Sequence, residues 1–86
     1  MIQLVFSVFD EKAGVYGNPI FVAKRGAAVR SFSDAVQEEG SKFAKHAGDY
    51  KLYYLGDFDN VSGELIKLKA PEFVAHASDY VEVNKE

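Results

Sequence analysis

The first two predicted strands come from the pattern of hydrophobic and polar positions near the start of the chain. Alternate residues from Ile2 to Val8 are apolar, and the residues between them are partly polar. A period of two is typical of a β-strand with one buried face, so we expect a strand over residues 2–9. Residues 10–18 contain two glycines and precede Pro19, which predicts a loop. A second strand over residues 20–24 then completes a hairpin with a long connection.

The period lengthens to three or four residues between positions 26 and 39, which predicts an amphipathic helix. Its apolar side chains include Phe32 and Val36, and charged side chains take the opposite side. Gly40 stands where a helix commonly ends. Ser41 is a suitable N-cap for a short helical turn over residues 42–47, and we expect Gly48 to end that turn.

Residues 50–58 return to strict alternation and predict another strand. Tyr50, Leu52 and Tyr54 fall on one side, with Lys51 and Tyr53 on the other. Residues 59–63 have the composition of a turn, and residues 64–69 follow as a partner strand. We therefore predict a single α+β domain over residues 1–86, with the order ββαββ. It consists of an antiparallel sheet of four to five strands with one main helix packed on one face.

The pattern FxxHAxDY occurs twice, thirty residues apart, beginning at Phe43 and at Phe73. Two copies are too few for a repeat protein, so we interpret them as one local shape used twice. The second copy then predicts a short helical turn over residues 71–77, begun by Pro71 at its first position. It also predicts a short edge strand over residues 80–83.

Each copy places a histidine three residues before an aspartate, which has two interpretations. On a helical turn the two side chains share a face, so both pairs together could bind a metal ion or form an acid–base couple. Alternatively, the aspartate hydrogen-bonds the turn and the histidine lies at the surface. No other motif supplies a nucleophile or a substrate pocket, so we expect the second interpretation. We predict neither an enzyme nor a cofactor nor a metal site.

The composition fits one small domain and excludes several classes of protein. The chain has 86 residues, of which 48% are hydrophobic, and this is too short for two domains. Cysteine is absent, which excludes disulfide frameworks and thiolate metal sites. The uncharged residues 1–9 are less than half the length of a membrane helix and lack a preceding basic region. We therefore expect a cytoplasmic protein without a membrane segment.

The net charge of −3 is unevenly distributed along the chain. Residues 1–23 sum to −1, residues 24–51 to +2 and residues 52–86 to −4. The protein therefore lacks the overall basic field that most nucleic-acid-binding proteins have. A contact with a polyanion has to use a local patch.

Twelve aromatic residues, five Tyr and seven Phe, exceed what a core of this size needs, so some rings are expected at the surface. One predicted sheet face combines Phe9 and Tyr53 with basic residues at Lys51, Lys67 and Lys69. Aromatic platforms beside positive charge are typical of sites for single-stranded nucleic acid. A solvated face with snorkelling lysines is one alternative, and a homodimer interface is another, since small domains gain burial by association. That predicted interface consists of Val5, Phe9, Tyr53 and Leu55.

Basic residues also cluster where the second predicted strand enters the helix. Lys24, Arg25 and Arg30 lie near the helix N-terminus, whose partial positive charge favours a phosphate. Three solvated cations without a ligand are the alternative.

The chain resembles the small nonstructural protein of gokushovirus-type microviruses, which are phages with small circular single-stranded DNA genomes. The resemblance lies in the ordered segments PIFVAKR, AVRSFSDAV and SKFAKHAGDYKLYYLGDFDNVSGEL. It extends from about Phe6 to Leu65. The most specific parts are residues 49–53, residues 55–59 and Gly63.

The resemblance implies a role in single-stranded genome synthesis or packaging in the host cytoplasm, with binding of single-stranded DNA. Phosphate contacts together with base stacking on Tyr53 or Phe9 then define the predicted site, which consists of Lys24, Arg25, Arg30, Lys51, Tyr53, Lys67 and Lys69. The alternative is a homodimeric protein-interaction module that regulates a viral replication or capsid component and does not bind DNA. The acidic net charge fits this alternative.

Overall fold

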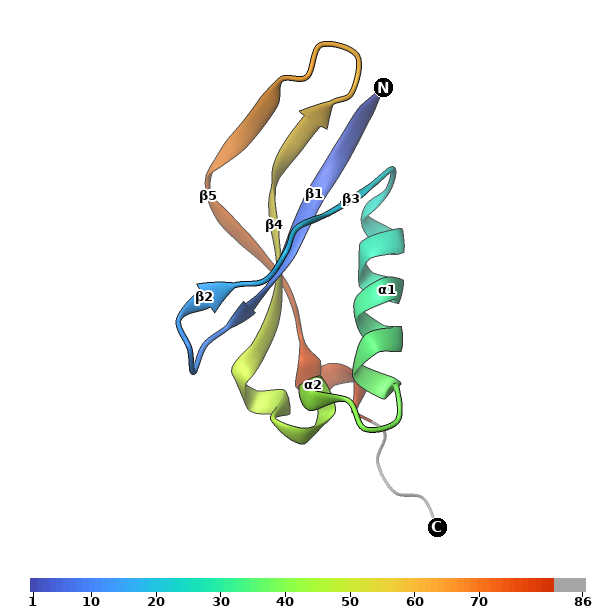
Figure 1. Ribbon diagram of the computed structural model, residues 1–86, viewed down its shortest axis with the longest axis vertical. Coiled ribbons are helices and arrows are strands. Elements are labelled where there is room, and N and C mark those ends of the chain that lie inside the picture. The colour runs from blue at the N-terminus through green and yellow to red at the C-terminus, as the bar shows by residue number, and fades with distance from the viewer. Residues whose placement is uncertain (82–86) are drawn as a thin grey trace.

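The computed structural model describes residues 1–81, which form one antiparallel sheet and one main helix (Figure 1). The strands are β1 (Ile2–Asp10), β2 (Val15–Tyr16), β3 (Ile20–Val22), β4 (Tyr50–Asp59) and β5 (Leu65–His76). The helices are α1 (Arg25–Gln37), the short α2 (Lys42–Lys45) and two 3₁₀ helices, η1 (Ala47–Asp49) and η2 (Ala77–Tyr80). The predicted α+β class, with five strands and one main helix, is confirmed. No helix in the described part of the chain is long and apolar enough to span a membrane.

Strand β1 is the centre of the sheet. It pairs with β4 along one edge, and β5 lies outside β4. Along its other edge it pairs with β2 near Phe9 and with β3 near Val5. The segment between β2 and β3 stays attached to β1, because Gly17 N–H donates to Val8 O at 2.8 Å and Ser7 Oγ donates to Gly17 O at 2.7 Å. The predicted loop over residues 10–18 is therefore partly a strand.

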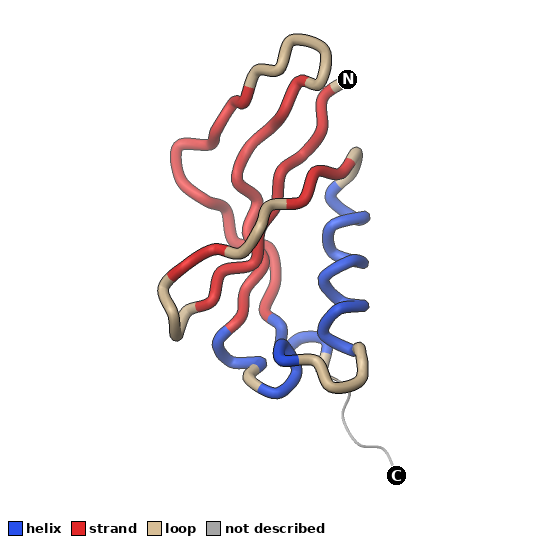
Figure 2. The backbone as a smooth tube through the Cα atoms, viewed as in Figure 1, coloured by secondary structure: helices blue, strands red, loops and turns tan. Residues whose placement is uncertain are grey.

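Helix α1 covers one face of the sheet along the half of the molecule that also carries α2 (Figure 2). Phe6 and Leu52 from the sheet are fully buried against Phe32 and Val36 of the helix. Burial of an apolar side chain of this size stabilises the fold by about 2 kcal/mol. The core therefore depends on the alternation in β1 and β4 meeting the helical period of α1.

Gly40 and Ser41 act after α1 as predicted, but Gly48 does not end the short helical turn, because it lies within η1. Gly40 has φ 77°, which is the left-handed conformation that glycine adopts most readily at helix ends. Ser41 then caps α2, since its side chain accepts hydrogen bonds from the N–H groups of Phe43 and Ala44 at 3.1 and 3.3 Å.

The two FxxHAxDY segments share only their second halves. In both copies the histidine is the N-cap of a 3₁₀ helix, His46 for η1 and His76 for η2. The predicted helical turn over residues 71–77 is wrong, because Phe73 to His76 pair with β4 as a strand. Proline is tolerated there because β5 is an edge strand. The predicted strand over 80–83 is also wrong at Tyr80, which belongs to η2, and residues 82–83 lie outside the described residues.

The pairing of β4 with β5 is interrupted around Gly56. Gly56 pairs with Lys67, but Tyr54 pairs with Glu72, so residues 68–71 bulge outward opposite Leu55. The β1–β4 ladder also shifts its register between Val5 and Phe6. β-Bulges of this kind bend a strand and increase its twist. They divide the sheet into a half covered by α1 and a half that projects beyond it.

Candidate nucleic-acid interface

Aromatic rings from four strands meet on the sheet face opposite α1. Val8 and Leu52 pack into the core, and successive side chains of a strand point to opposite faces. Phe9 and Tyr53 therefore lie on the far face, together with their register partners on β2 and β5. We call this set the aromatic row: Tyr16, Phe9, Tyr53, Phe73 and His76.

The rings of the aromatic row contact one another in sequence across the sheet. The centroid of Phe9 lies 4.7 Å from that of Tyr16 and 6.1 Å from that of Tyr53. Tyr53 lies 6.0 Å from Phe73, which lies 4.6 Å from His76. Two of these pairs are edge-to-face, which is a preferred arrangement of aromatic side chains, and the other two are tilted. The packing holds each ring in place without a ligand.

The ends of the row are open to solvent. Tyr16 is 41% exposed and Phe73 is 44% exposed, whereas Phe9 and Tyr53 are half-buried between them. Large exposed aromatic side chains in a continuous group are uncommon on a solvated surface and commonly mark a binding site. The row therefore offers exposed aromatic surface to a ligand at Tyr16 and at Phe73.

Lys51 lies beside the row, but its charge is compensated. Its Nζ contacts Glu11 Oε1 at 2.5 Å, and its side chain is only 18% exposed. Lys51 is the register partner of both Phe9 and His76, which places it on the same face as the row. A phosphate at this point has to compete with the Glu11 carboxylate.

The three basic residues near the start of α1 lie on the opposite side of the sheet from the aromatic row. Arg25 forms an ion pair with Glu72 at 3.3 Å, and Glu72 is the register partner of Tyr54, whose ring packs against Phe6 on the helix side. Lys24 and Arg30 are exposed and line an open groove of about 620 Å³.

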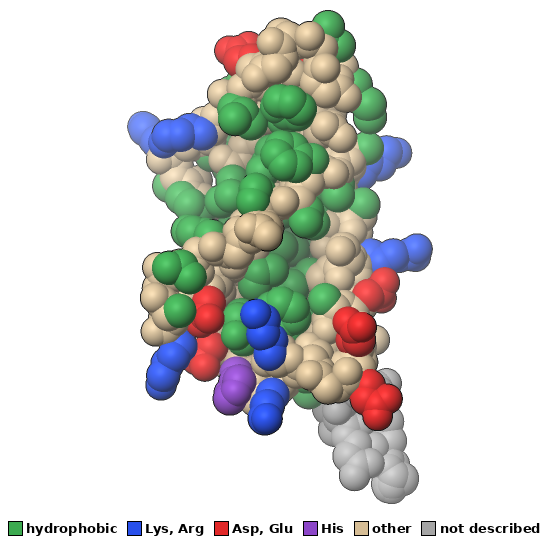
Figure 3. Space-filling model, in the orientation of Figure 1, with side chains coloured by type: hydrophobic (Ala, Val, Ile, Leu, Met, Phe, Trp, Pro, Cys, Tyr) green, Lys and Arg blue, Asp and Glu red, His purple; other side chains and the backbone are tan. Residues whose placement is uncertain are grey.

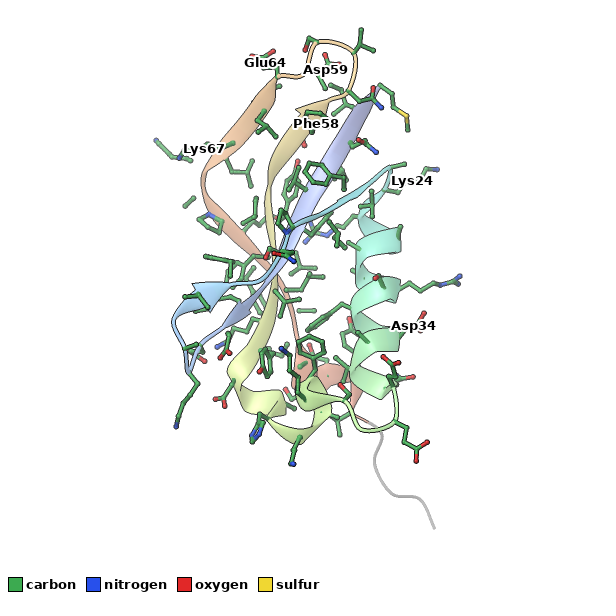
Figure 4. The ribbon with its side chains drawn as sticks, in the orientation of Figure 1. Lys24, Asp34, Phe58, Asp59, Glu64 and Lys67 are labelled. Atoms are coloured by element: carbon green, nitrogen blue, oxygen red, sulfur yellow. The ribbon has the colours of Figure 1, made fainter. Side chains whose placement is uncertain are left out.

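Lys67 and Lys69 form a third group, on the exposed outer strand β5. Lys24 and Lys67 point away from the molecule on opposite sides (Figure 4). The predicted site residues are therefore distributed over three separate surfaces. Of them, only Lys51 and Tyr53 lie on the face of the aromatic row, together with Phe9 of the predicted dimer interface.

The other residues of the predicted dimer interface are largely covered within the chain. Val5 is only 8% exposed, which leaves little of it for a partner. Leu55 is partly buried and lines an open apolar hollow of about 160 Å³ together with Val5, Leu65 and Ile66.

Two polar pairs lie on the helix side of the sheet: the Arg25–Glu72 ion pair joins α1 to β5, and Tyr54 pairs with Asp57 within β4. The Tyr54 hydroxyl donates a hydrogen bond to Asp57 Oδ1. This bond, together with burial and the charges of Asp57 and Glu72, raises the pKa of Tyr54 to about 12, although Arg25 opposes the shift. The hydrogen bond to Asp57 fixes the hydroxyl in its neutral form and is structural in character.

The His–Asp pairs serve the turns in which they occur. In the second copy Asp79 Oδ2 accepts a hydrogen bond from the His76 backbone N–H at 3.1 Å. In the first copy the Asp49 backbone N–H donates to the His46 carbonyl at 2.8 Å. Within residues 1–81 no three His, Asp or Glu side chains form a group that could hold a metal ion.

Three members of the aromatic row were not predicted as site residues: Tyr16, Phe73 and His76. The predicted loop over residues 10–18 contains Tyr16, and the predicted helical turn over residues 71–77 contains the other two. The available signal was Val15-Tyr16, a short apolar pair that could continue the hairpin with β1.

A family model described as phage ORF5 protein matches residues 3–80. No curated protein and no solved structure matches the chain. The match covers most of the chain, including every strand but the first residue of β1. The chain therefore belongs to the phage ORF5 protein family.

Proposed function

We propose that this phage protein is a microvirus nonstructural protein that binds single-stranded DNA during genome synthesis or packaging in the host cytoplasm. The observation that carries the proposal is the aromatic row on the uncovered face of the sheet. The proposed activity is binding, without catalysis or a cofactor.

The row suits unpaired bases because stacking needs an accessible base face. In a duplex the faces of the bases are already stacked on each other, whereas in a single strand they are free to lie on protein rings. Phe73 and Tyr16 are the exposed large hydrophobic residues of the row and are the expected stacking partners. Tyr53 and Phe9 lie between these two residues and pack against their rings.

The backbone contacts are expected to be few. Lys51 is the basic residue on the face of the row, and it is paired with Glu11. A bound DNA strand reaches the basic residues near α1 only if it continues around the β3 edge to the helix side; these are Lys24, Arg25 and Arg30. It reaches Lys67 and Lys69 only if it continues along β5. Each phosphate contact to a single strand contributes about −0.7 to the slope of log affinity against log salt. We expect a shallow slope of about −1 to −2.

The test is fluorescence anisotropy with a labelled single-stranded oligonucleotide of about 30 nucleotides, at low and near-physiological salt, with duplex DNA as competitor. We expect saturable binding that a duplex competes for poorly. Replacing Lys24 and Arg25 together by alanine flattens the salt slope if the strand reaches the helix side. Absence of binding at low salt contradicts the proposal.

One observation favours the second candidate, a protein-interaction module without DNA affinity. Acidic and basic side chains alternate around the lower half of the visible face, while hydrophobic side chains occupy its middle (Figure 3). Intermingled charges of this kind suit a protein partner better than a polyanion. This candidate predicts no binding in the same anisotropy experiment.

A further inference from the structure

The aromatic row has a charged side and an uncharged side on its own face of the sheet. Lys51 lies two residues before Tyr53 on β4, and Glu11 follows the end of β1 and contacts Lys51. On the other side of the row, along the same two strands, lie Ser7 and Leu55. Ser7 is buried, and its hydroxyl already donates to a backbone carbonyl. Because neither Ser7 nor Leu55 carries a charge, a DNA backbone that lies along the row is expected on the Lys51 side.

Lys51 is held at the edge of the row. It is the register partner of Phe9 on β1 and of His76 on β5, so its stem lies between two members of the row. A lysine side chain commonly extends its charged end into solvent, but this one is only 18% exposed, and its Nζ contacts Glu11 Oε1 at 2.5 Å. The ammonium group therefore has a fixed position, and one carboxylate occupies it.

Glu11 is free to leave this contact, whereas Lys51 is not. The Glu11 side chain is 55% exposed and belongs to the turn after β1. Its backbone N–H donates to the Asp49 carbonyl oxygen at 2.7 Å, which anchors the main chain when the side chain moves. An ion pair with so exposed a partner contributes little to stability, because water solvates the released carboxylate well. The Glu11 side chain can therefore turn outward without a change in the fold.

We propose that the Glu11 carboxylate occupies the position of a DNA phosphate at Lys51, and that the phosphate displaces it when a single strand binds. This inference rests on the proposed DNA-binding function. Carboxylates and phosphates both offer anionic oxygens to an ammonium group, so Lys51 exchanges one for the other without moving. With bases on Tyr16 and Phe73, the DNA backbone then crosses the strands on the Lys51 side of the row.

Glu11 thereby limits the affinity for DNA. Each binding event breaks the ion pair and leaves the Glu11 carboxylate near the phosphates of the strand, which repel it. Glu11→Gln keeps the length of the side chain but removes its charge, so Lys51 is available to a phosphate from the start. We expect the dissociation constant for single-stranded DNA to fall about three- to tenfold at low salt. The slope of log affinity against log salt becomes steeper by about 0.7, the contribution of one phosphate contact.

The experiment is fluorescence anisotropy of the full chain with a labelled single-stranded oligonucleotide of about 30 nucleotides, over a series of salt concentrations. Glu64→Gln is the matched control, because it changes the net charge equally. Glu64 is exposed and lies at the β4–β5 hairpin, at the end of the molecule away from the turn after β1 (Figure 4). We expect this control to bind like the wild type. In a Lys51→Met background, Glu11→Gln should give a smaller gain and no steeper salt slope.

The possible outcomes separate this inference from the proposed function. If the wild type binds DNA and Glu11→Gln binds no more tightly, the displacement is wrong and the DNA site stands. An equal gain in Glu64→Gln also overturns the displacement, since the effect then comes from net charge. If neither the wild type nor Glu11→Gln binds at low salt, both proposals fail. Circular dichroism checks the fold of each variant, and Glu11→Ala serves in place of a glutamine variant that has lost it.

Discussion

At Gly56 the backbone of β5 leaves no room for a side chain. A Cβ atom at this position would lie 2.4 Å from the Ile66 carbonyl oxygen and 2.8 Å from the Lys67 Cα. Both neighbours are backbone atoms, so neither strand can move away easily. In addition, the φ of Gly56 is 155°, a conformation that residues with a side chain rarely adopt. We expect Gly56→Ala to destabilise the fold by about 1–3 kcal/mol, as measured by urea denaturation.

Gly48→Ala is the control for this substitution. A Cβ at Gly48 meets nothing within 4 Å, and Gly48 does not have a positive φ, so its stability should stay within about 0.5 kcal/mol of the wild type. Equal stability of the two variants would contradict the close approach at Gly56.

Tyr54 makes the stability sensitive to alkaline pH. Its pKa is raised from 10 in the unfolded chain to about 12 in the fold, so the folded state holds the hydroxyl proton more tightly. Below pH 10 Tyr54 is protonated in both the folded and the unfolded chain, and its hydroxyl contributes fully to the free energy of unfolding. This stabilisation is lost as the pH rises from 10 to 12. We expect Tyr54→Phe to cost about 1 kcal/mol at neutral pH and to lose less stability than the wild type over this interval.

Denaturation at several pH values compares Tyr54→Phe with Tyr53→Phe, which removes a hydroxyl from the other face. Parallel alkaline profiles of Tyr54→Phe and the wild type would show that the hydrogen bond to Asp57 does not form.

At the scale of elements, the hydrophobic period predicts a helix or strand correctly where local sequence alone determines the secondary structure. The strand over residues 2–9, the main helix and the strand over residues 50–58 all agree with the structure to within one or two residues. The repeated FxxHAxDY segment misled at Phe73, because pairing with β4 overrides local similarity. Sequence alone could not show this pairing, since it depends on a bulge at residues 68–71.

The candidate site was predictable only in part for a similar reason. Phe9, Lys51 and Tyr53 follow from the alternation within single strands. Tyr16 and Phe73 lie beside these residues because of the pairing register between strands. The alternation within one strand does not specify that register.

The cap of α2 allows a prediction for this element. Ser41 accepts two backbone hydrogen bonds at the start of a helix of only four residues, so Ser41→Ala should cost about 1 kcal/mol. Ser31→Ala, at an exposed position within α1, is the control and should be nearly neutral. Thermal unfolding of both variants measures the difference, and equal melting temperatures would exclude a role for the cap.

At the scale of the whole molecule, the sheet has two halves. Helix α1 lies against one half, and the other half extends beyond the helix (Figure 2). The aromatic row is on the face opposite α1, next to the core residues Val8 and Leu52 along the same strands. The candidate site is therefore carried by the strand segments that also form the core.

The most direct test of the account is the affinity of Phe73→Ala for single-stranded DNA, compared with Phe21→Ala. The two side chains are 44% and 43% exposed, but only Phe73 belongs to the aromatic row. Because one stacked base contributes about 1–3 kcal/mol, we predict that Phe73→Ala weakens binding about 5- to 150-fold. Phe21→Ala should bind like the wild type. An equal loss in both variants, or none in Phe73→Ala, would contradict a binding site on the aromatic row.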